Sequence, residues 1–274
     1  MAEPRDLAAE VAATAPRYRL AVRGPRFRGR IGGRRGHGVG SSMEFVDFRD
    51  YVPGDDLRQV DWRGYARTNQ LRIRLTQEEV APHVDVLLDT SASMASTGGK
   101  ERAVRLLALA MLRWAQREGA VARVLALGAA AVDPAVEPFA GTATEPALPA
   151  VPLRANGIRV LLTDGLWAGD PTPLLRRVAT GAAFVVFVQV LDPWEIEPAA
   201  EGALTIVDVE TGARHEVQLD VATAAACRER VARLCDGLRA TVLAGGGVHV
   251  RTSAADLATM CSRDLLPGSV LEPA

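Results

Sequence analysis

Apolar and polar residues alternate with two different periods along this chain, and the change of period divides it into segments. A period of two, typical of a strand with one buried face, runs through residues 43–52 and again through 71–80. The stretch between them, 53–68, opens with a turn and two acids that favour the start of a helix. These patterns predict a strand–helix–strand block over residues 43–80.

From residue 81 onward, continuous apolar runs alternate with segments of helical period. The runs at 83–89 and 157–165 are typical of strands buried on both faces of a parallel sheet, and 99–119 has a helical apolar face. The other expected elements are strands over 120–128, 182–192 and 247–253, a short edge strand over 135–140, a helix over 171–180, a hairpin over 203–220, and helices over 221–243 and from residue 254. This order predicts an α/β fold with a doubly wound, mostly parallel sheet in residues 81–274, preceded by the strand–helix–strand extension.

Residues 1–42 differ from the rest in charge and glycine content. Eight arginines and no acid lie between Arg17 and Arg35, and seven glycines lie in 17–42. We expect a basic, Gly/Arg-rich arm that is mostly loop, preceded by a weakly helical lead. A polyanion-binding or partner-docking strip is the alternative. The whole chain has a formal net charge of −1 and few aromatic residues interrupt the arginines, so nucleic acid is not expected as the main partner.

Cysteine spacing and hydropathy indicate the cellular setting. The three cysteines, Cys227, Cys235 and Cys261, form no metal-ligand or redox pair by spacing, so we expect buried free thiols in a reducing cytosol. The longest apolar run, 182–191, is far shorter than the roughly 20 residues that span a bilayer. The first 20 residues contain acids and no apolar core of a secretory signal. The sequence therefore predicts a cytoplasmic protein without a membrane span.

Two expected strands end in aspartates that suggest a site. The segment DVLLDTSASM places Asp89, Ser91 and Ser93 at alternating positions after one strand, and VLLTDG places Asp164 after another. Ligands of such sheets sit beyond the carboxyl ends of the strands, so these oxygens are expected in one crevice. Oxygen ligands of this kind suit a hard divalent cation, Mg²⁺ or Mn²⁺. Taken alone, however, Ser91 or Ser93 could equally cap the following helix.

Other site chemistries fit the pattern less well. An aspartate-nucleophile phosphatase would have a second acid two residues after Asp89, where Ser91 stands. The segment lacks the Gly-x-Ser-x-Gly of a serine hydrolase and the glycine spacing of a phosphate-binding loop. A magnesium-dependent hydrolase or phosphatase using Asp89 and Asp164 stays open as the alternative function, although no histidine or glutamate adjoins either motif to act as a base.

The two motifs together resemble the metal-ion-dependent adhesion site of von Willebrand factor A domains. Its Asp-x-Ser-x-Ser pattern falls on Asp89, Ser91 and Ser93, and its later aspartate falls on Asp164. The resemblance also implies a ligand threonine from an intervening loop, for which Thr142 is the first candidate and Thr144 the second. It implies a von Willebrand factor A-like, Rossmann-like fold and a metal that binds an acidic side chain of a partner.

The block before this domain carries a longer motif. EFVDFRDYVPGDDLRQVDWRGYART resembles the signature of the domain-of-unknown-function family that accompanies MoxR-type AAA+ ATPases. The matching positions are Arg49, Tyr51, Gly54, Asp55, Asp56, Arg58, Asp61, Trp62, Ala66 and Arg67. From the residues alone, the opposed charges suggest a salt-bridge network that fixes the block to the main fold, with Trp62 and Tyr51 as anchors. The resemblance implies a non-enzymatic interaction protein that works with a MoxR-type ATPase on client proteins.

Overall fold

The chain folds into two compact units. The computed structural model describes residues 4–21, 43–78, 83–141, 147–199 and 202–274. We call residues 1–24 and 82–274 the sheet unit, and residues 25–81 the hairpin unit. In chain order, the hairpin unit is therefore an insertion into the sheet unit.

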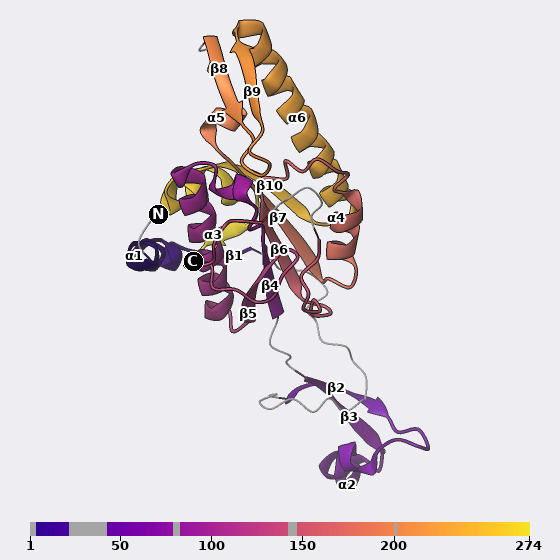
Figure 1. Cartoon of the computed structure of the whole chain (residues 1–274). Helices are drawn as coiled ribbons and strands as arrows, with labels where there is room; N and C mark the ends of the chain where they lie inside the picture. The colour runs from indigo at the N-terminus through magenta and orange to yellow at the C-terminus, as the bar shows by residue number, and fades with distance from the viewer. Residues whose placement is uncertain (1–3, 22–42, 79–82, 142–146, 200–201) are drawn as a thin grey trace. The chain divides into compact units, whose positions relative to one another are not determined.

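The centre of the sheet unit is a five-stranded parallel sheet (Figure 1). Its strands are β4 (His83–Leu88), β5 (Val121–Ala126), β6 (Ile158–Thr163), β7 (Phe184–Leu191) and β10 (Val248–Ser253), in the spatial order β10-β7-β6-β4-β5. The predicted α/β fold with a parallel sheet is confirmed. The first strand, β4, lies between the second and the third, so the chain winds outward in opposite directions from the β4/β6 boundary. This is the flavodoxin-like strand order, and the boundary is its topological switch point.

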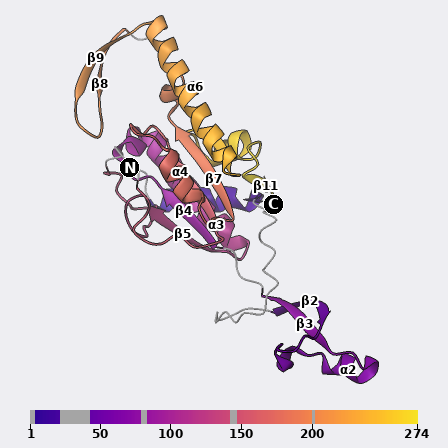
Figure 2. The ribbon, with the colours of Figure 1, turned by 90° about the vertical axis from the view of Figure 1, so that its right-hand side faces the viewer.

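Helices cover both faces of this sheet (Figures 1 and 2). One face packs against α1 (Pro4–Thr14), α3 (Gly98–Arg117) and α7 (Leu257–Met260), and the other packs against α4 (Thr172–Ala179) and α6 (Val221–Ala244). Strand β4 shows why both faces are apolar. Val84, Val86 and Leu88 belong to the core on the α3 side, whereas Leu87 belongs to the core on the α4 side.

The N-terminal segment is part of the sheet unit, which differs from the expected arm. Leu7 and Val11 are buried one helical turn apart on α1, so a short apolar stripe in an alanine-rich helix suffices to pack it against α3. Beyond it, η1 (Ala15–Arg17) leads into β1 (Tyr18–Leu20), which pairs antiparallel with β11 (Leu271–Pro273). The rest of the expected arm, residues 22–42, lies outside the described residues.

The connections at the carboxyl edge are less regular. After β7 come α5 (Pro193–Ile196), β8 (Gly202–Val207) and β9 (Arg214–Leu219). Strands β8 and β9 form a two-stranded sheet, so the predicted hairpin is confirmed.

The edge strand predicted over 135–140 is wrong, because that segment forms a turn and extended chain instead. Prolines at 134 and 138 remove backbone donors that a strand would need. A π-helical turn, η5 (Cys261–Leu265), follows α7.

The hairpin unit contains the predicted strand–helix–strand block. Strands β2 (Met43–Asp50) and β3 (Arg72–Glu78) pair antiparallel, and η3 (Leu57–Gln59) and α2 (Trp62–Thr68) lie between them in sequence. Helix α2 ends at Asn69, whose φ of 57° is the left-handed conformation that stops a helix. Among side chains described in this unit, only Val60 and Ile73 are buried apolar residues.

Two further expectations concern the whole chain. Within the described ranges, no helix is long and apolar enough to cross a bilayer. All three cysteines are free thiols: Cys235 and Cys261 are buried as expected, whereas Cys227 is exposed. Burial raises the pKa of the Cys261 thiol to about 12, so this side chain stays protonated and inert.

Candidate functional site

Asp89 and Asp164 follow the two strands that form the switch point. Asp89 comes directly after β4. Thr163 is the last residue of β6, and Asp164 follows it. Both carboxylates therefore lie at the carboxyl edge of the sheet, where open α/β sheets bind ligands. The backbone joins them there as well, because Asp89 N donates to Leu162 O over 2.9 Å. The structure thus brings together the two motifs that are 75 residues apart in the sequence.

The Asp89 carboxylate is buried and firmly held. Its Oδ1 accepts from the backbone N–H of Ser91 at 3.0 Å, while its Oδ2 accepts from Thr163 Oγ1 at 2.6 Å and Trp167 Nε1 at 3.2 Å. Asp89 is only 3% exposed. A carboxylate has about four acceptor positions, so three hydrogen bonds leave one for a water or a metal ion. Asp89 is oriented for binding and has little freedom to rotate.

The two serines of the motif present their hydroxyls side by side. Ser91 Oγ and Ser93 Oγ are 3.0 Å apart and hydrogen-bond each other. Octahedral Mg²⁺ has oxygen ligands at about 2.1 Å, which places neighbouring ligands about 3.0 Å from each other. The serine pair therefore has the spacing of one edge of such an octahedron, and Asp89 lies beside it.

Neither serine acts as the cap of the following long helix. Thr97 is the N-cap of α3, and its Oγ1 accepts from Lys100 N at 3.1 Å. Ser91 precedes the short turn η4 (Ala92–Ala95) but makes no side-chain capping bond. The capping interpretation of DTSAS is therefore wrong, and the two hydroxyls bond each other instead of the helix backbone.

A neighbouring loop runs along this turn. Ala92 N donates to Gly141 O at 2.9 Å, and Gly141 N donates to Thr90 O at 3.0 Å. A side chain at Gly141 would meet Thr90 O at 3.2 Å, so glycine permits this close approach. Thr142 and Thr144, the candidate threonine ligands, follow immediately but lie outside the described residues.

Asp164 is bound to a cation of the chain itself. Lys100 Nζ lies 2.8 Å from Asp164 Oδ2 and 2.8 Å from Glu195 Oε1, and the lysine side chain is fully buried. Asp164 Oδ1 accepts from Leu166 N at 3.0 Å. Burial alone would lower the pKa of Lys100, but the attraction of the two carboxylates outweighs it and raises the pKa. Lys100 is therefore a permanent positive charge beside the predicted site.

A second layer of bonds fixes the lysine's partners. Glu195 Oε2 accepts from Asp192 N at 2.7 Å within a capping box of α5. Asp192 Oδ2 in turn accepts from Thr97 Oγ1 at 2.7 Å. The start of α3, the end of β7 and α5 are thereby linked through polar side chains.

The residues fit a divalent cation on the side formed by Asp89, Ser91 and Ser93. Within the described part of the chain, no cluster of three or more His, Cys, Asp or Glu side chains could hold a metal. The candidate set here consists of one carboxylate and two hydroxyls, a weaker and harder donor set that matches Mg²⁺ or Mn²⁺ rather than zinc.

The signature residues of the hairpin unit have mostly local structural roles. Arg49 forms a bidentate ion pair with Asp55: Nη1 lies 2.7 Å from Oδ2, and Nη2 lies 2.6 Å from Oδ1. This pair lowers the pKa of the Asp55 carboxyl to about 2. Asp56 accepts from Arg58 N and caps η3, while Gly54 has a φ of 106° in the turn. Tyr51 N donates to Leu71 O, which closes the two strands. The salt bridges described for this unit are internal to it, so the predicted network that fixes the block to the main fold stays a prediction.

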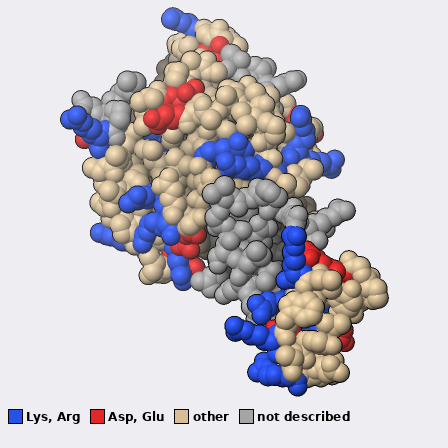
Figure 3. All heavy atoms as spheres, turned by 90° about the horizontal axis from the view of Figure 1, so that it is seen from below, with Lys and Arg blue, Asp and Glu red and all other residues tan. Residues whose placement is uncertain are grey.

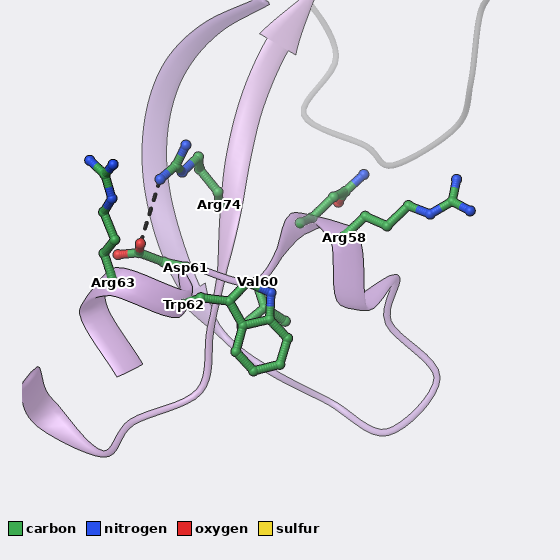
Figure 4. A pocket seen from close by; sticks show the side chains of 7 residues that line it. Arg58, Val60, Asp61, Trp62, Arg63 and Arg74 are labelled. Carbon is green, nitrogen blue, oxygen red and sulfur yellow. Dashed lines mark hydrogen bonds and ion pairs between the residues drawn. The ribbon is translucent and has the colours of Figure 1, made fainter. Parts of the chain in front are cut away.

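Other signature residues line a cavity of about 440 Å³ (Figure 4). Asp61 pairs with Arg74 at 3.5 Å, and Trp62 is 55% exposed, edge-on to Tyr65. The lining residues are Arg58, Gln59, Val60, Asp61, Trp62, Arg63 and Arg74. Basic side chains also gather on this unit in the space-filling view (Figure 3). Arg67 is an exposed residue of α2. The lining therefore combines one exposed aromatic ring with three arginines.

Several residues of the site are not evident from the motifs. Thr163 and Trp167 orient Asp89, Lys100 pairs with Asp164, and Glu195 pairs with Lys100. Lys100 had one signal in the sequence: it is the only lysine among 32 basic residues. The other partners come from strand ends and loops whose proximity depends on the sheet order.

Comparison with known proteins gives a family match over part of the chain. Residues 47–135 match the family described as "Protein of unknown function DUF58", a span that includes both Arg49 and Asp89. The chain is 28% identical over 237 residues to the uncharacterized protein Rv1480 of Mycobacterium tuberculosis (strain ATCC 25618 / H37Rv), with 74% of each chain covered. The same values hold for the uncharacterized protein Mb1516 of Mycobacterium bovis.

Two solved structures are also similar. One is the conserved hypothetical protein BatB from Bacteroides thetaiotaomicron, with 15% identity and a TM-score of 0.31, covering 66% of this chain and 95% of that one. The other is an aerotolerance-related membrane protein from Bacteroides fragilis NCTC 9343, with 16% identity and a TM-score of 0.31, covering 66% and 96%.

Proposed function

We propose that this protein is a non-enzymatic interaction module that binds partner proteins through a divalent cation at the switch point of its sheet. The observation that carries the proposal is the serine pair, with hydroxyls 3.0 Å apart beside the oriented carboxylate of Asp89. In this proposal the fold is von Willebrand factor A-like, and Mg²⁺ or Mn²⁺ is held by Asp89, Ser91 and Ser93 with a threonine, Thr142, from the adjacent loop.

The chemistry of the donor set suits binding of an acidic partner. Two neutral hydroxyls and one carboxylate neutralise only part of a 2+ charge, so the bound ion supplies a strong attraction for a further carboxylate. In this proposal, an aspartate or glutamate of a client protein is that ligand. The residues of this chain position the ion and exclude bulk water, since Asp89 and Ser91 are each 3% exposed.

The hairpin unit supports a partner of the MoxR type. Its signature motif, together with the DUF58 match over residues 47–135, resembles proteins that accompany MoxR-type AAA+ ATPases. We propose that such an ATPase supplies nucleotide chemistry and that the two proteins act together in assembling or activating protein complexes.

Calorimetric titration with MgCl₂ and MnCl₂ tests the metal site. The wild-type protein should bind one ion, and Asp89→Asn and Ser93→Ala should abolish binding. Ser96→Ala is a matched control, because this exposed serine lies three residues beyond Ser93 and should bind metal like the wild type. No binding by wild type, or undiminished binding by Asp89→Asn, would refute the proposal.

Co-purification with a co-expressed MoxR-type ATPase tests the partner. The wild-type protein should recover the ATPase, and recovery should persist in Ser93→Ala, because in this proposal the client and not the ATPase supplies the carboxylate to the metal. No recovery with wild type would refute the partner. Metal-dependent hydrolysis of phosphate esters, lost in Asp89→Asn, would instead favour the hydrolase alternative.

A further inference from the structure

The single lysine of this chain occupies an unusual position. All other basic residues among the 32 are arginine, yet position 100 is a lysine with no exposed surface. It is the third residue of α3, where a cation opposes the helix dipole, and it follows two glycines that favour helix formation poorly. Local helix stability therefore argues against this residue, and its tertiary contacts must account for it.

Those contacts are the ones a bound cation would make. Lys100 Nζ bridges Asp164 Oδ2 and Glu195 Oε1 at 2.8 Å each, in the crevice predicted to hold a metal. An ammonium is a compact point charge, whereas the planar guanidinium of arginine is wider and needs a matching fork of acceptors. The buried space between two carboxylates from different elements suits the smaller group.

We propose that Lys100 is a resident cation that removes Asp164 from the direct ligands of the metal and thereby keeps the metal site weak and incompletely neutralised. This inference rests on the proposed function and departs from the motif-based ligand set in which Asp164 belongs to the metal. With Lys100 in place, Asp89, Ser91 and Ser93 form the metal-binding side of the crevice, and Asp164 and Glu195 form the lysine-binding side.

The division has a consequence for partner binding. A metal ion with one protein carboxylate near it, and an ammonium beyond, retains more positive charge than an ion between two free carboxylates. Such an ion attracts a carboxylate of a partner more strongly. The lysine thus lowers the affinity of the site for the metal and raises the affinity of the metal-loaded site for an acidic partner.

Replacement of the lysine tests the inference by calorimetry. A positive charge separated from a divalent ion by a single carboxylate weakens binding of that ion by roughly tenfold or more at the permittivity of a protein interior. Lys100→Met should therefore bind Mg²⁺ at least about tenfold more tightly than wild type. Arg113→Met is the matched control: Arg113 is an exposed arginine on the same helix, and its loss changes net charge equally. Metal affinity of this control should equal that of wild type.

A double-mutant cycle identifies the route. Asp164→Asn should weaken Mg²⁺ binding far more in the Lys100→Met background than in wild type, because only there is the carboxylate free to face the ion. Equal effects in both backgrounds would show that Lys100 does not withhold Asp164. If Lys100→Met does not fold, Lys100→Gln replaces it, since its amide can still donate to a carboxylate.

The lysine can also be observed directly, because lysine-selective ¹⁵N labelling yields one side-chain ammonium signal. In wild type this signal should be protected from exchange and should persist at saturating Mg²⁺. Loss of the signal on metal addition would mean that Asp164 leaves Lys100 for the metal, and the inference would be wrong.

The outcomes separate the two proposals. If wild type binds Mg²⁺ and Lys100→Met binds it no more tightly, the inference fails while the proposed function stands. If only Lys100→Met binds, the inference stands and the native protein works without metal. If neither binds, both fail.

Discussion

Both units of this protein hold an arginine or lysine against an aspartate, but in very different surroundings. In the sheet unit, Lys100 and Asp164 are 2.8 Å apart with side chains that are 0% and 2% exposed. In the hairpin unit, Arg74 and Asp61 are 3.5 Å apart, and the arginine side chain is 52% exposed. A buried pair becomes costly when one member is lost, whereas an exposed pair contributes about 0–1 kcal/mol.

The same contrast holds for aromatic residues. Trp114 is completely buried and donates to Ala15 O in η1, whereas Trp62 is 55% exposed and lines the cavity that arginines share. The lysine and the tryptophan compared in the sheet unit are buried and bond within that unit, whereas Arg74 and Trp62 of the hairpin unit lie at its surface. Stability should respond to changes in the first unit, and binding should respond to changes in the second.

The largest effect is expected for Lys100→Met. Two buried carboxylates would lose their counter-charge, so the free energy of unfolding should fall by about 3–5 kcal/mol. Urea denaturation followed by circular dichroism measures it. The double variant Lys100→Met/Asp164→Asn removes one charge of each sign and should recover a large part of the loss; no recovery would mean that packing, not charge, explains the cost.

A core truncation in the hairpin unit should act locally. Ile73 is 1% exposed and is one of two buried apolar side chains described there, so Ile73→Ala should cost about 2–5 kcal/mol of that unit's stability. Hydrogen exchange should quicken in β2 and β3 and stay unchanged in β4 and β6. Equal acceleration in both units would show that the two units do not unfold independently.

Acid should weaken the two units in different pH ranges. Burial, with Arg239 and Arg251 nearby, lowers the pKa of His249 to about 4, so the unfolded sheet unit binds this proton first. The contribution of neutral His249 to the stability of the sheet unit is therefore complete above pH 6.5, and it is lost as the pH falls towards 4. The lowered pKa of Asp55, about 2, means that the Arg49–Asp55 contribution is complete above 3.8 and is lost only towards pH 2.

Urea midpoints measured for each unit across these ranges check this. His249→Phe retains the ring that lies 5.2 Å from Phe187 and should reduce the pH dependence of the sheet unit between 6.5 and 4. It should not remove it entirely, because burial also lowers the pKa of His83. Unchanged pH dependence in His249→Phe would exclude this histidine as the cause.

The smallest effect on stability is expected for Trp62→Ala. An exposed side chain gives up little buried area, so the free energy of unfolding should change by about 0.5 kcal/mol or less. Recovery of the co-expressed ATPase should nevertheless fall, because exposed tryptophan and arginine dominate protein interfaces. Unchanged recovery would leave the cavity of the hairpin unit without a role in this contact.

Much of the architecture follows from the sequence because parallel strands are long apolar runs. The runs that became β4, β6 and β7, and the hairpin β8–β9, were all predictable from patterning. The role of residues 4–21 was not, since α1 is alanine-rich and β1 has three residues paired to the far end of the chain. Long-range pairing of this kind leaves no periodic signal.

The candidate site divides in the same way. Asp89, Ser91 and Ser93 are close in sequence, so their motif predicts their proximity. The pairing of Asp164 with Lys100 depends on the strand order and on where α3 begins. Sequence patterns give the aspartate, but they do not indicate that its charge is already neutralised from within the chain.

The pairing of β1 with β11 makes the N-terminal segment separable. Residues 4–21 are held by the β1–β11 ladder, by apolar contacts of α1 and by the bonds of Trp114 and Arg117 to Ala15 O. The chain then passes through residues 22–42 to the hairpin unit before returning to the sheet. We expect cleavage within that stretch to give two pieces that can reassociate, so that a short peptide completes the fold.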